Sequence, residues 1–325
     1  MNKTVSVLIT SKENKSEQLK HLLHSLVVQD IRYLRIYLIL DRKNDLLIND
    51  IQKILKPVEF FFNDNHCITY IQNKIMKNLN SELILLLNDD IILENYFISS
   101  LTDSIDKNEK IGICCGKIKR MDKITIDSAG QFLARSRKPL DRGYGQKDKG
   151  QFDSAEYIFG ACGAAVLYRK KMLESIQITP GEYFDNDYHL FYEDLDIAWR
   201  AQNLGWKVFY DPKAVCYHVR GATVKQNKPK FSFLNNFNFA WLPNSLKVDV
   251  IKNRYMTIIK NDKLSNFLIN LPFILFYDLK VFIYCLFFCP IVIKNCLNKV
   301  PLIMNAWKKR KYYYLKYEKI RQKEC

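Results

Sequence analysis

Two groups of acidic residues have the types and the spacing that chemistry requires. In the first, Asp89 and Asp90 follow Asn88 directly at the end of a leucine-rich run over residues 83–87. Neighbouring carboxylates repel each other when they lose water, and a divalent cation is a common reason for placing them together. The alternative is an exposed loop whose acids are solvated, and this motif by itself leaves both interpretations open.

The second group comprises Glu193, Asp194 and Asp196, at the start of a helix that we expect over residues 193–204 and that should stop at Gly205. Acidic residues at a helix start are often mere partners of the helix dipole, so this group alone is weak support for a site. Together, the two groups could hold a metal ion with a diphosphate and accept a proton. Displacement of a nucleotide from a sugar requires both, because the leaving diphosphate needs its charge stabilised and the attacking hydroxyl needs a base.

Three apolar runs, each ending in polar residues, are the elements that would position such a site. They cover residues 5–9, 36–40 and 83–87. Leucines at helical spacing between the first two runs predict a strand, helix, strand unit, which closes by a right-handed crossover into a parallel sheet. The sequence therefore predicts an α/β fold with a mostly parallel sheet.

In such sheets ligands bind beyond the carboxyl ends of the strands. We therefore expect the polar residues after the three runs to converge on one crevice. These residues are Thr10, Glu13, Asp41, Asn88, Asp89 and Asp90. No glycine-rich loop of the GxGxxG or GxxxxGK[ST] type follows the runs, so a bound nucleotide would need another way to neutralise its phosphates. A metal ion held by carboxylates is the obvious substitute.

Composition and charge narrow the class of protein. With 48% hydrophobic and 26% charged residues, the 325-residue chain is neither disordered nor fibrous. Residues 1–206 carry 28 basic and 28 acidic side chains, whereas residues 207–325 carry 22 and 6, which accounts for the net charge of +16. A basic region of this kind suits nucleic acid, an anionic membrane surface or phosphorylated substrates. The nine cysteines form no CxxC pair, which favours reduced thiols on the cytosolic side.

The C-terminal region combines apolar and basic segments. Residues 264–293 are strongly apolar, but Asp278 and Lys280 interrupt them. The resulting halves, about 14 and 13 residues long, fall short of the ~20 residues that a simple spanning helix needs. We therefore expect interfacial or re-entrant segments rather than a transmembrane helix. Residues 294–325 are rich in basic and aromatic side chains, which suits a lipid headgroup boundary.

Several segments of the chain resemble glycosyltransferase family 2. Those similar to the family's nucleotide-binding half are residues 5–10, 26–29, 36–41 and 85–90. Those similar to its acceptor half are residues 160–168, 184–185 and 191–196, with Arg200, Gly205 and His218. The resemblance extends over about residues 3–223. It is closest to rhamnosyltransferase-like bacterial members, which build surface polysaccharides on lipid carriers.

The resemblance implies a GT-A fold, which is Rossmann-like, and an inverting sugar transfer that uses Mg²⁺ or Mn²⁺. Asp90 would bind the metal ion through the diphosphate, His218 would complete that site, and Asp194 would be the catalytic base for the acceptor hydroxyl. The donor-binding residues would be Thr10, Glu13, Asp41, Asn88 and Asp89. The acceptor-side residues would be Glu193, Asp196 and Gly163.

We therefore expect a GT-A catalytic domain over residues 1–245 and a basic, apolar, helical membrane-associating region over residues 246–325. The expected activity is sugar transfer from a nucleoside diphosphate donor to a hydroxyl of a lipid-linked glycan, in bacterial surface polysaccharide synthesis. It would take place at the cytoplasmic face of the cell membrane, with peripheral or monotopic attachment. The glycine-containing segment over residues 127–153 motivates rhamnose as the first hypothesis for the sugar.

Two alternatives remain open at this stage. Asn88 occupies the first position of the D-x-D motif, which makes a catalytically inactive sugar-nucleotide-binding partner subunit conceivable. The basic C-terminal third makes a nucleic-acid-binding protein conceivable. The second alternative is less favoured, because its basic residues flank apolar runs and no helix-turn-helix, zinc finger or RNP motif occurs.

Overall fold

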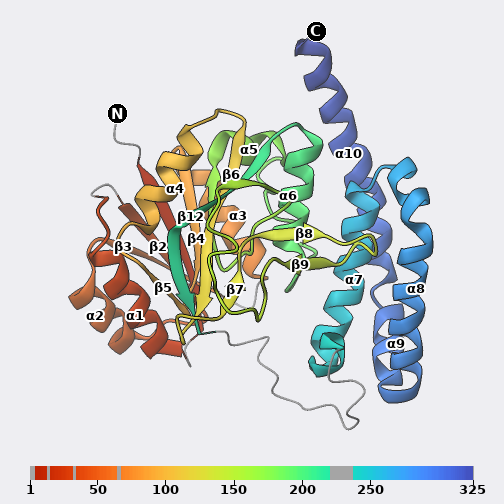
Figure 1. Cartoon of the computed structure of the whole chain (residues 1–325), viewed down its shortest axis with the longest axis horizontal. Helices are drawn as coiled ribbons and strands as arrows, with labels where there is room; N and C mark the ends of the chain where they lie inside the picture. The colour runs from red at the N-terminus through yellow and green to blue at the C-terminus, as the bar shows by residue number, and fades with distance from the viewer. Residues whose placement is uncertain (1–3, 13–14, 32–33, 64–66, 220–236, 325) are drawn as a thin grey trace. The chain divides into compact units, whose positions relative to one another are not determined.

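The chain divides into two compact units, which we describe from a computed structural model (Figure 1). The structure describes residues 4–12, 15–31, 34–63, 67–219 and 237–324. Unit 1 consists of Met1–Phe132, Asp141–Asn186 and Ile197–Val219, and unit 2 consists of Leu133–Leu140, Asp187–Asp196 and Arg220–Cys325. Unit 2 thus includes two short segments from the first part of the chain. The functional boundary between residues 245 and 246 stays a prediction.

Unit 1 is built on a large mixed sheet. Its strands follow the order β10-β12-β6-β11-β4-β1-β2-β3, with β5 paired to β12 and β7 paired to β6. Their bounds are β1 Val5–Ser11, β2 Leu34–Leu40, β3 Val58–Phe62, β4 Leu83–Asn88, β5 Ile91–Leu93, β6 Ile111–Arg120, β7 Ile126–Ser128, β10 Glu156–Ile158, β11 Ala165–Arg169 and β12 Lys207–His218. Two further strands, β8 (Gln131–Leu133) and β9 (Pro139–Asp141), pair with each other. Strands β4, β1, β2 and β3 are parallel neighbours, which confirms the predicted mostly parallel α/β fold.

The sheet is buried on both faces because its apolar strands alternate between two hydrophobic cores. In β1, for example, Val7 and Ile9 belong to one core and Leu8 to the other. The first core is covered by α1 (Ser16–Val27), α2 (Asp45–Ile54) and α4 (Phe97–Asp106). The second is covered by α3 (Ile68–Asn78), α5 (Lys170–Ser175) and the later part of α6 (Glu193–Asn203) (Figure 1). The leucines whose spacing predicted α1 are all buried.

Strand register brings the polar strand ends to one edge of the sheet. Strand β1 lies between β2 and β4, and its residue Thr10 pairs with Asn88 of β4. Asp41 directly follows β2, and Asp89 directly follows β4. Because the three strands are parallel, these residues share the carboxyl edge, as the sequence predicted.

Helix α6 ends close to where the sequence predicted. Its last residue is Asn203, and Gly205 follows with a φ of 80°. That conformation is strained for residues with a side chain but not for glycine, so Gly205 is suited to terminate the helix. The N–H of Trp206 then donates to the carbonyl of Ala201, which satisfies a carbonyl at the helix end.

A buried asparagine ties α3 to the loop after α5. The side chain of Asn73 is 4% exposed, and its Oδ1 accepts hydrogen bonds from the N–H groups of Tyr183 and Phe184, at 3.0 and 2.9 Å. Its Nδ2 donates to the Phe184 carbonyl at 2.7 Å and to Asn186 Oδ1 at 2.9 Å. Because water does not reach these groups, Asn73 is what satisfies the backbone of this loop.

The described part of unit 2 is mainly helical. Its elements are η3 (Asn238–Trp241), α7 (Asn244–Asn261), α8 (Leu264–Phe288), α9 (Pro290–Leu297) and α10 (Val300–Glu324). A third apolar core joins η3, α7, α8 and α9 around residues such as Phe239, Val281 and Cys285. Helix α7 also packs against α10.

Most of the apolar segment, residues 264–288, forms one continuous helix, so the expectation of two short halves divided at Asp278 and Lys280 is wrong. Helix α8 passes through Asp278 and Lys280 without a break. Asp278 Oδ1 lies 2.6 Å from Arg254 Nη1 of α7, so its charge is balanced within the bundle and does not end the helix. By length and composition alone, α8 could cross a membrane, and no second helix among the described residues meets that test.

The hydrogen bonds of Asn73 lead to a stability prediction. The variant Asn73→Ala should lower the free energy of unfolding by about 3 kcal/mol, because it leaves two backbone N–H groups and a carbonyl buried without partners. Urea unfolding followed by tryptophan fluorescence measures this change. The exposed neighbour Lys74 provides the control Lys74→Ala, which should stay within about 0.5 kcal/mol of the wild type. Equal effects of the two variants would contradict the assigned role.

Candidate active site

Two buried carboxylates mark the end of β4. Asp89 and Asp90 are only 4% and 3% exposed. The ammonium of Lys15, the residue before α1, lies 3.1 Å from Asp89 Oδ1 and 2.9 Å from Asp90 Oδ2. Asp89 Oδ2 also accepts a hydrogen bond from the Lys12 N–H at 3.1 Å. These contacts offset a negative charge that would otherwise be costly to bury.

The two carboxyl groups differ in acidity. Burial raises the pKa of Asp89 above its usual value, although Lys15 and the Lys12 N–H act against this shift. Burial acts in the same direction on Asp90, but the contacts with His218 and Lys15 outweigh it and hold the pKa of Asp90 below its usual range. Asp90 is therefore the better anionic ligand of the pair at neutral pH.

His218, at the end of β12, lies between two carboxylates. Its Nε2 is 3.2 Å from Asp90 Oδ1, and its Nδ1 is 2.8 Å from Oδ2 of the fully buried Asp127 in β7. Burial acts to lower the pKa of His218, but the two aspartates outweigh it and raise that pKa. A carboxylate on one ring nitrogen fixes the orientation of the ring, which is the usual support for a metal-binding histidine.

Asp90 and His218 fit a divalent cation in part. Asp90 Oδ1 is buried and accepts no hydrogen bond of good geometry, and it lies beside the imidazole nitrogen of His218. Carboxylate oxygens suit Mg²⁺ and Mn²⁺, and Mg²⁺ is usually bound by one or two carboxylates together with water and substrate phosphates. Within the described ranges, no group of three or more His, Cys, Asp or Glu residues is arranged around a common point. The residues therefore fit a cation whose remaining ligands come from a phosphate group and water.

The other predicted residues near β1 and β2 occupy the same carboxyl edge of the sheet. Thr10 is partly buried, and its Oγ1 accepts a hydrogen bond from Gln72 Nε2 of α3 at 3.4 Å. Asp41 is exposed to solvent. Glu13 lies outside the described residues. The roles predicted for these residues stay predictions.

Asn88 and Gly163 lie close together through the pairing of β4 with β11. The N–H of Asn88 donates to the Ala164 carbonyl at 2.9 Å, and Gly163 directly precedes Ala164. Asn88 itself is exposed, and Gly163 is partly buried. The structure therefore places Gly163 near the carboxyl end of β4, where the two buried aspartates directly follow Asn88.

The second acidic group begins α6 in unit 2, and its members differ in environment. Asp196 is fully buried, with its Oδ1 at 3.0 Å from Lys260 Nζ and 2.8 Å from Asn261 Nδ2, both on α7. Asp194 is partly exposed, and its Oδ1 accepts a hydrogen bond from the Leu195 N–H at 2.7 Å. Asp196 is thus committed to an internal ion pair, whereas Asp194 can meet a ligand from solvent.

Glu193 keeps its proton at neutral pH. Burial raises its pKa to about 8, and the negative charges of Asp194 and Asp249 add to the shift. Its Oε2 atom is buried without a hydrogen bond. A neutral acid therefore stands directly beside Asp194, and a strongly shifted pKa of this kind is typical of functional sites.

A strained turn presents this acidic group. Phe191 and Tyr192 have φ values of 70° and 73°, a region that costs residues with a side chain roughly 1–2 kcal/mol each. Asn253 of α7 holds the turn, because its Nδ2 donates to the carbonyls of Leu190 and Phe191 at 2.8 Å each. Helix α7 is therefore the support that fixes the start of α6.

Comparison with known proteins identifies the family. The sequence matches the model of the glycosyltransferase like family 2 over residues 2–242. The chain belongs to this family. No curated protein sequence matches the chain.

Two solved structures show the same fold as this glycosyltransferase. One is GalNAc-T7 with UDP, GalNAc and Mn²⁺, with a TM-score of 0.57 and 14% identity over 79% of this chain and 48% of that one. The other is the mannosyltransferase PcManGT from Pyrobaculum calidifontis with GDP-Man and Mn²⁺, with a TM-score of 0.54 and 10% identity over 98% of this chain and 87% of that one. The chain thus spans about half the length of GalNAc-T7. At these identities the likeness shows the fold, and it confirms the expected GT-A architecture.

Three residues that support one or other of the two candidate acidic groups were not singled out from the sequence. They are Lys15, Asp127 and Asn253. Lys15 belongs to the polar loop after the first strand, and Asp127 begins the glycine-containing segment over residues 127–153. Neither residue belongs to a motif with a fixed spacing. Strand pairing and helix packing bring them to their partners, so only coordinates could identify them.

The raised pKa of Glu193 predicts how the stability of the glycosyltransferase depends on pH. Between its usual pKa of 4.5 and the folded value of about 8, the folded protein holds a proton that the unfolded chain has released. The free energy of unfolding should therefore fall as pH rises through this window, by at most about 1.4 kcal/mol per pH unit for one proton. Urea unfolding at several pH values should show a shallower decline for Glu193→Gln. The exposed Glu59 provides the control Glu59→Gln, and parallel curves for wild type and Glu193→Gln would show that Glu193 titrates normally.

Proposed function

We propose that this glycosyltransferase moves a sugar from a nucleoside diphosphate donor to a hydroxyl group of a lipid-linked glycan, with inversion. The observation that carries the proposal is the pair formed by Asp90 and His218 at the carboxyl edge of a GT-A sheet. One oxygen of Asp90 is buried there without a hydrogen bond, beside an imidazole that Asp127 orients. An anionic ligand and an oriented imidazole suit a site for a diphosphate and its cation.

On the donor side, Asp90 and His218 would hold Mg²⁺ or Mn²⁺. When bound, the ion would stabilise the charge that develops on the leaving diphosphate. Lys15 places a second positive charge within 3 Å of Asp90, where it can also attract phosphate oxygens. The residues expected to contact the nucleotide or sugar are Thr10, Glu13, Asp41, Asn88 and Asp89. GalNAc-T7 with UDP and Mn²⁺, and PcManGT with GDP-Man and Mn²⁺, support this class of donor and cofactor.

On the acceptor side, Asp194 would take the proton of the attacking hydroxyl. Its partial exposure suits that role, and Glu193 keeps its own proton at neutral pH and so adds no second negative charge. Asp196 would act indirectly, because its ion pair with Lys260 anchors the start of α6 to α7. Gly163, which has no side chain, would leave room for the acceptor.

The proposed sugar is rhamnose, and the proposed setting is the cytoplasmic face of a bacterial cell membrane during surface polysaccharide synthesis. Rhamnose rests on the resemblance to rhamnosyltransferase-like members and on the segment over residues 127–153. Peripheral or monotopic membrane association is supported by α8, whose exposed side chains include Ile269, Phe276 and Phe287, at 65, 75 and 73% exposure. The basic residues of α10 would add attraction to anionic lipid, ~1 kcal/mol for each residue near the surface.

A donor screen tests the proposal. The full chain is incubated with deoxythymidine, uridine and guanosine diphosphate sugars, with Mg²⁺ or Mn²⁺ and a mixture of lipid-linked acceptors, and products are detected by mass spectrometry. Transfer from deoxythymidine diphosphate rhamnose is expected. Transfer only from another donor would reject rhamnose. Donor binding without any transfer would favour the inactive partner subunit instead.

Removal of the Asp90 carboxylate should abolish metal-dependent donor binding. In Asp90→Ala the cation would lose its anionic ligand, so calorimetry with the donor and Mn²⁺ should show no binding above that measured without metal. Asp50→Ala, which changes a partly exposed aspartate of α2, is the control and should bind like the wild type. An unchanged affinity of Asp90→Ala in the presence of metal would rule out the assigned role.

Replacement of Asp194 should affect turnover rather than donor binding. Asp194→Asn cannot accept the hydroxyl proton, so kcat should fall by ~10² to 10⁴. Donor affinity, measured by calorimetry, should remain nearly unchanged, which separates this variant from Asp90→Ala. Wild-type turnover in Asp194→Asn would show that the base lies elsewhere.

A further inference from the structure

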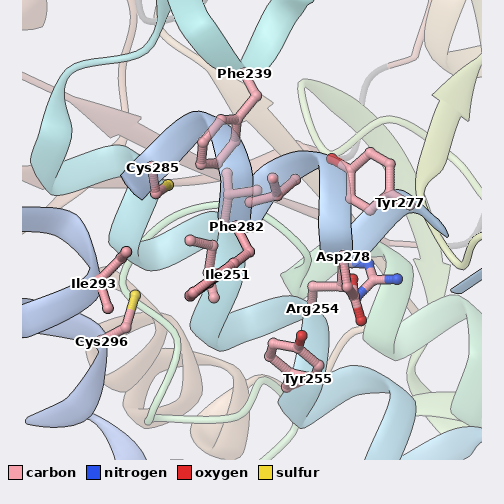
Figure 2. Close-up of a pocket in the computed structure, with 12 residues that line it drawn as sticks. Phe239, Ile251, Arg254, Tyr255, Tyr277, Asp278, Phe282, Cys285, Ile293 and Cys296 are labelled. Atoms are coloured by element: carbon pink, nitrogen blue, oxygen red, sulfur yellow. The ribbon is translucent and has the colours of Figure 1, made fainter. Parts of the chain in front are cut away.

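A cavity of about 140 Å³ lies inside unit 2, between η3, α7, α8 and α9 (Figure 2). It belongs to the part of unit 2 formed by residues 237–324. Most of its wall consists of aliphatic, aromatic and sulfur-containing side chains. Cavities of about this size and lining hold apolar molecules of roughly six carbons, such as benzene.

The two ends of the cavity differ in polarity. Figure 2 shows Cys285, Ile293 and Cys296 toward one end, and Arg254 with Asp278 toward the other. The ion pair of Arg254 with Asp278, at 2.6 Å, balances the charge at the polar end. The cavity is therefore suited to an amphiphile whose apolar part is larger than its polar part.

Arg254 has one hydrogen-bond donor to spare. Its side chain is 2% exposed, its Nη1 contacts Asp278, and its Nη2 donates to the Ser136 carbonyl at 2.6 Å. Its Nε has no hydrogen-bond partner and is buried. A buried donor without a partner costs about 1–3 kcal/mol, and an oxygen atom of a ligand at the polar end would recover that cost.

The cavity wall continues onto an exposed apolar stripe of α8. Phe282 lines the cavity and is 51% exposed. At helical spacing from it lie Leu275, Leu279 and Leu286, exposed by 57, 56 and 50%. A hydrocarbon chain longer than about six carbons could therefore leave the cavity past Phe282 and continue along this stripe into a membrane.

We propose that this cavity binds the head-proximal carbons of a single-chain phosphate lipid, the kind of lipid that would carry the acceptor glycan. A head-group oxygen accepts the hydrogen bond of Arg254 Nε, about six carbons fill the cavity, and the remaining chain lies along the α8 stripe. The cavity has room for one chain, so a two-chain phospholipid, whose chains start at the same head group, fits it less well. The proposal extends the proposed function, because it assigns a site to the lipid part of the acceptor.

Photo-crosslinking in vesicles tests the proposal on the full chain. The probes are a single-chain prenyl phosphate and a two-chain phospholipid, each with a diazirine about five carbons from the head group, in phosphatidylcholine and phosphatidylglycerol vesicles. Mass spectrometry then locates the labelled residues. The single-chain probe should label cavity residues such as Ile251, Ile293 and Cys296, whereas the phospholipid probe should label the exposed stripe of α8.

A matched pair of variants distinguishes probe labelling inside the cavity from labelling at the surface. Ile293→Trp places an indole in the cavity and should reduce cavity labelling about tenfold, which corresponds to about 1.4 kcal/mol. Phe287→Trp changes a residue that is 73% exposed and does not line the cavity, so its labelling should match the wild type. Vesicle co-sedimentation and donor binding by calorimetry should be the same for both variants.

Several outcomes would overturn the proposal. The proposal fails if the single-chain probe labels only exposed residues of α8 in the wild type. This measurement does not depend on whether a variant folds. Equal cavity labelling in Ile293→Trp and wild type would overturn the proposal as well. If the chain fails to sediment with vesicles, the membrane part of the proposed function fails, and the same probe in dilute aqueous solution still decides whether the cavity takes a single chain.

Discussion

Two neighbouring carboxylates, almost fully removed from water, must be neutralised at the end of β4. This constraint organises the carboxyl edge of the sheet. Lys15 reaches both Asp89 and Asp90 from the loop before α1, while His218 approaches Asp90 from the end of β12. Because β12 lies several strands away from β4 in the sheet, the contact requires β5 to pair with β12 and carry the chain across. The contact of His218 with Asp90 therefore depends on the order in which the strands pair.

The acidic group of unit 2 is held in place differently, by side chains of helix α7. Asn253 satisfies the carbonyls of a strained turn, and Lys260 takes up the charge of Asp196. With these groups anchored, Glu193 and Asp194 begin α6 in a fixed conformation. Strain of this kind persists only where surrounding contacts determine the backbone, and it is concentrated at functional sites. In unit 2, the same helix α7 also contributes Arg254 to the internal cavity.

The sequence was sufficient for features that depend on local pattern. Continuous apolar runs predicted three of the strands, leucine spacing predicted α1, and parallel topology predicted that Thr10, Asp41 and Asn88 would share one edge. The sequence could not predict features that depend on residues far apart in the chain. Asp278 was expected to interrupt the apolar segment, because its neutralisation by Arg254 arises only when α7 packs against α8. The support of His218 by Asp127 likewise depends on the pairing of β7 with β6, which no spacing rule specifies.

Asp90 and His218, on our proposal, hold a divalent cation together with the diphosphate of a donor. Electron spin echo spectroscopy of Mn²⁺ bound to ¹⁵N-histidine-labelled protein tests this claim most directly. With a nucleoside diphosphate present, the account predicts hyperfine coupling of Mn²⁺ to one ¹⁵N nucleus and to ³¹P, with the nitrogen coupling lost in His218→Ala. Coupling to ³¹P without any nitrogen coupling, or a nitrogen coupling that survives in His218→Ala, would contradict it.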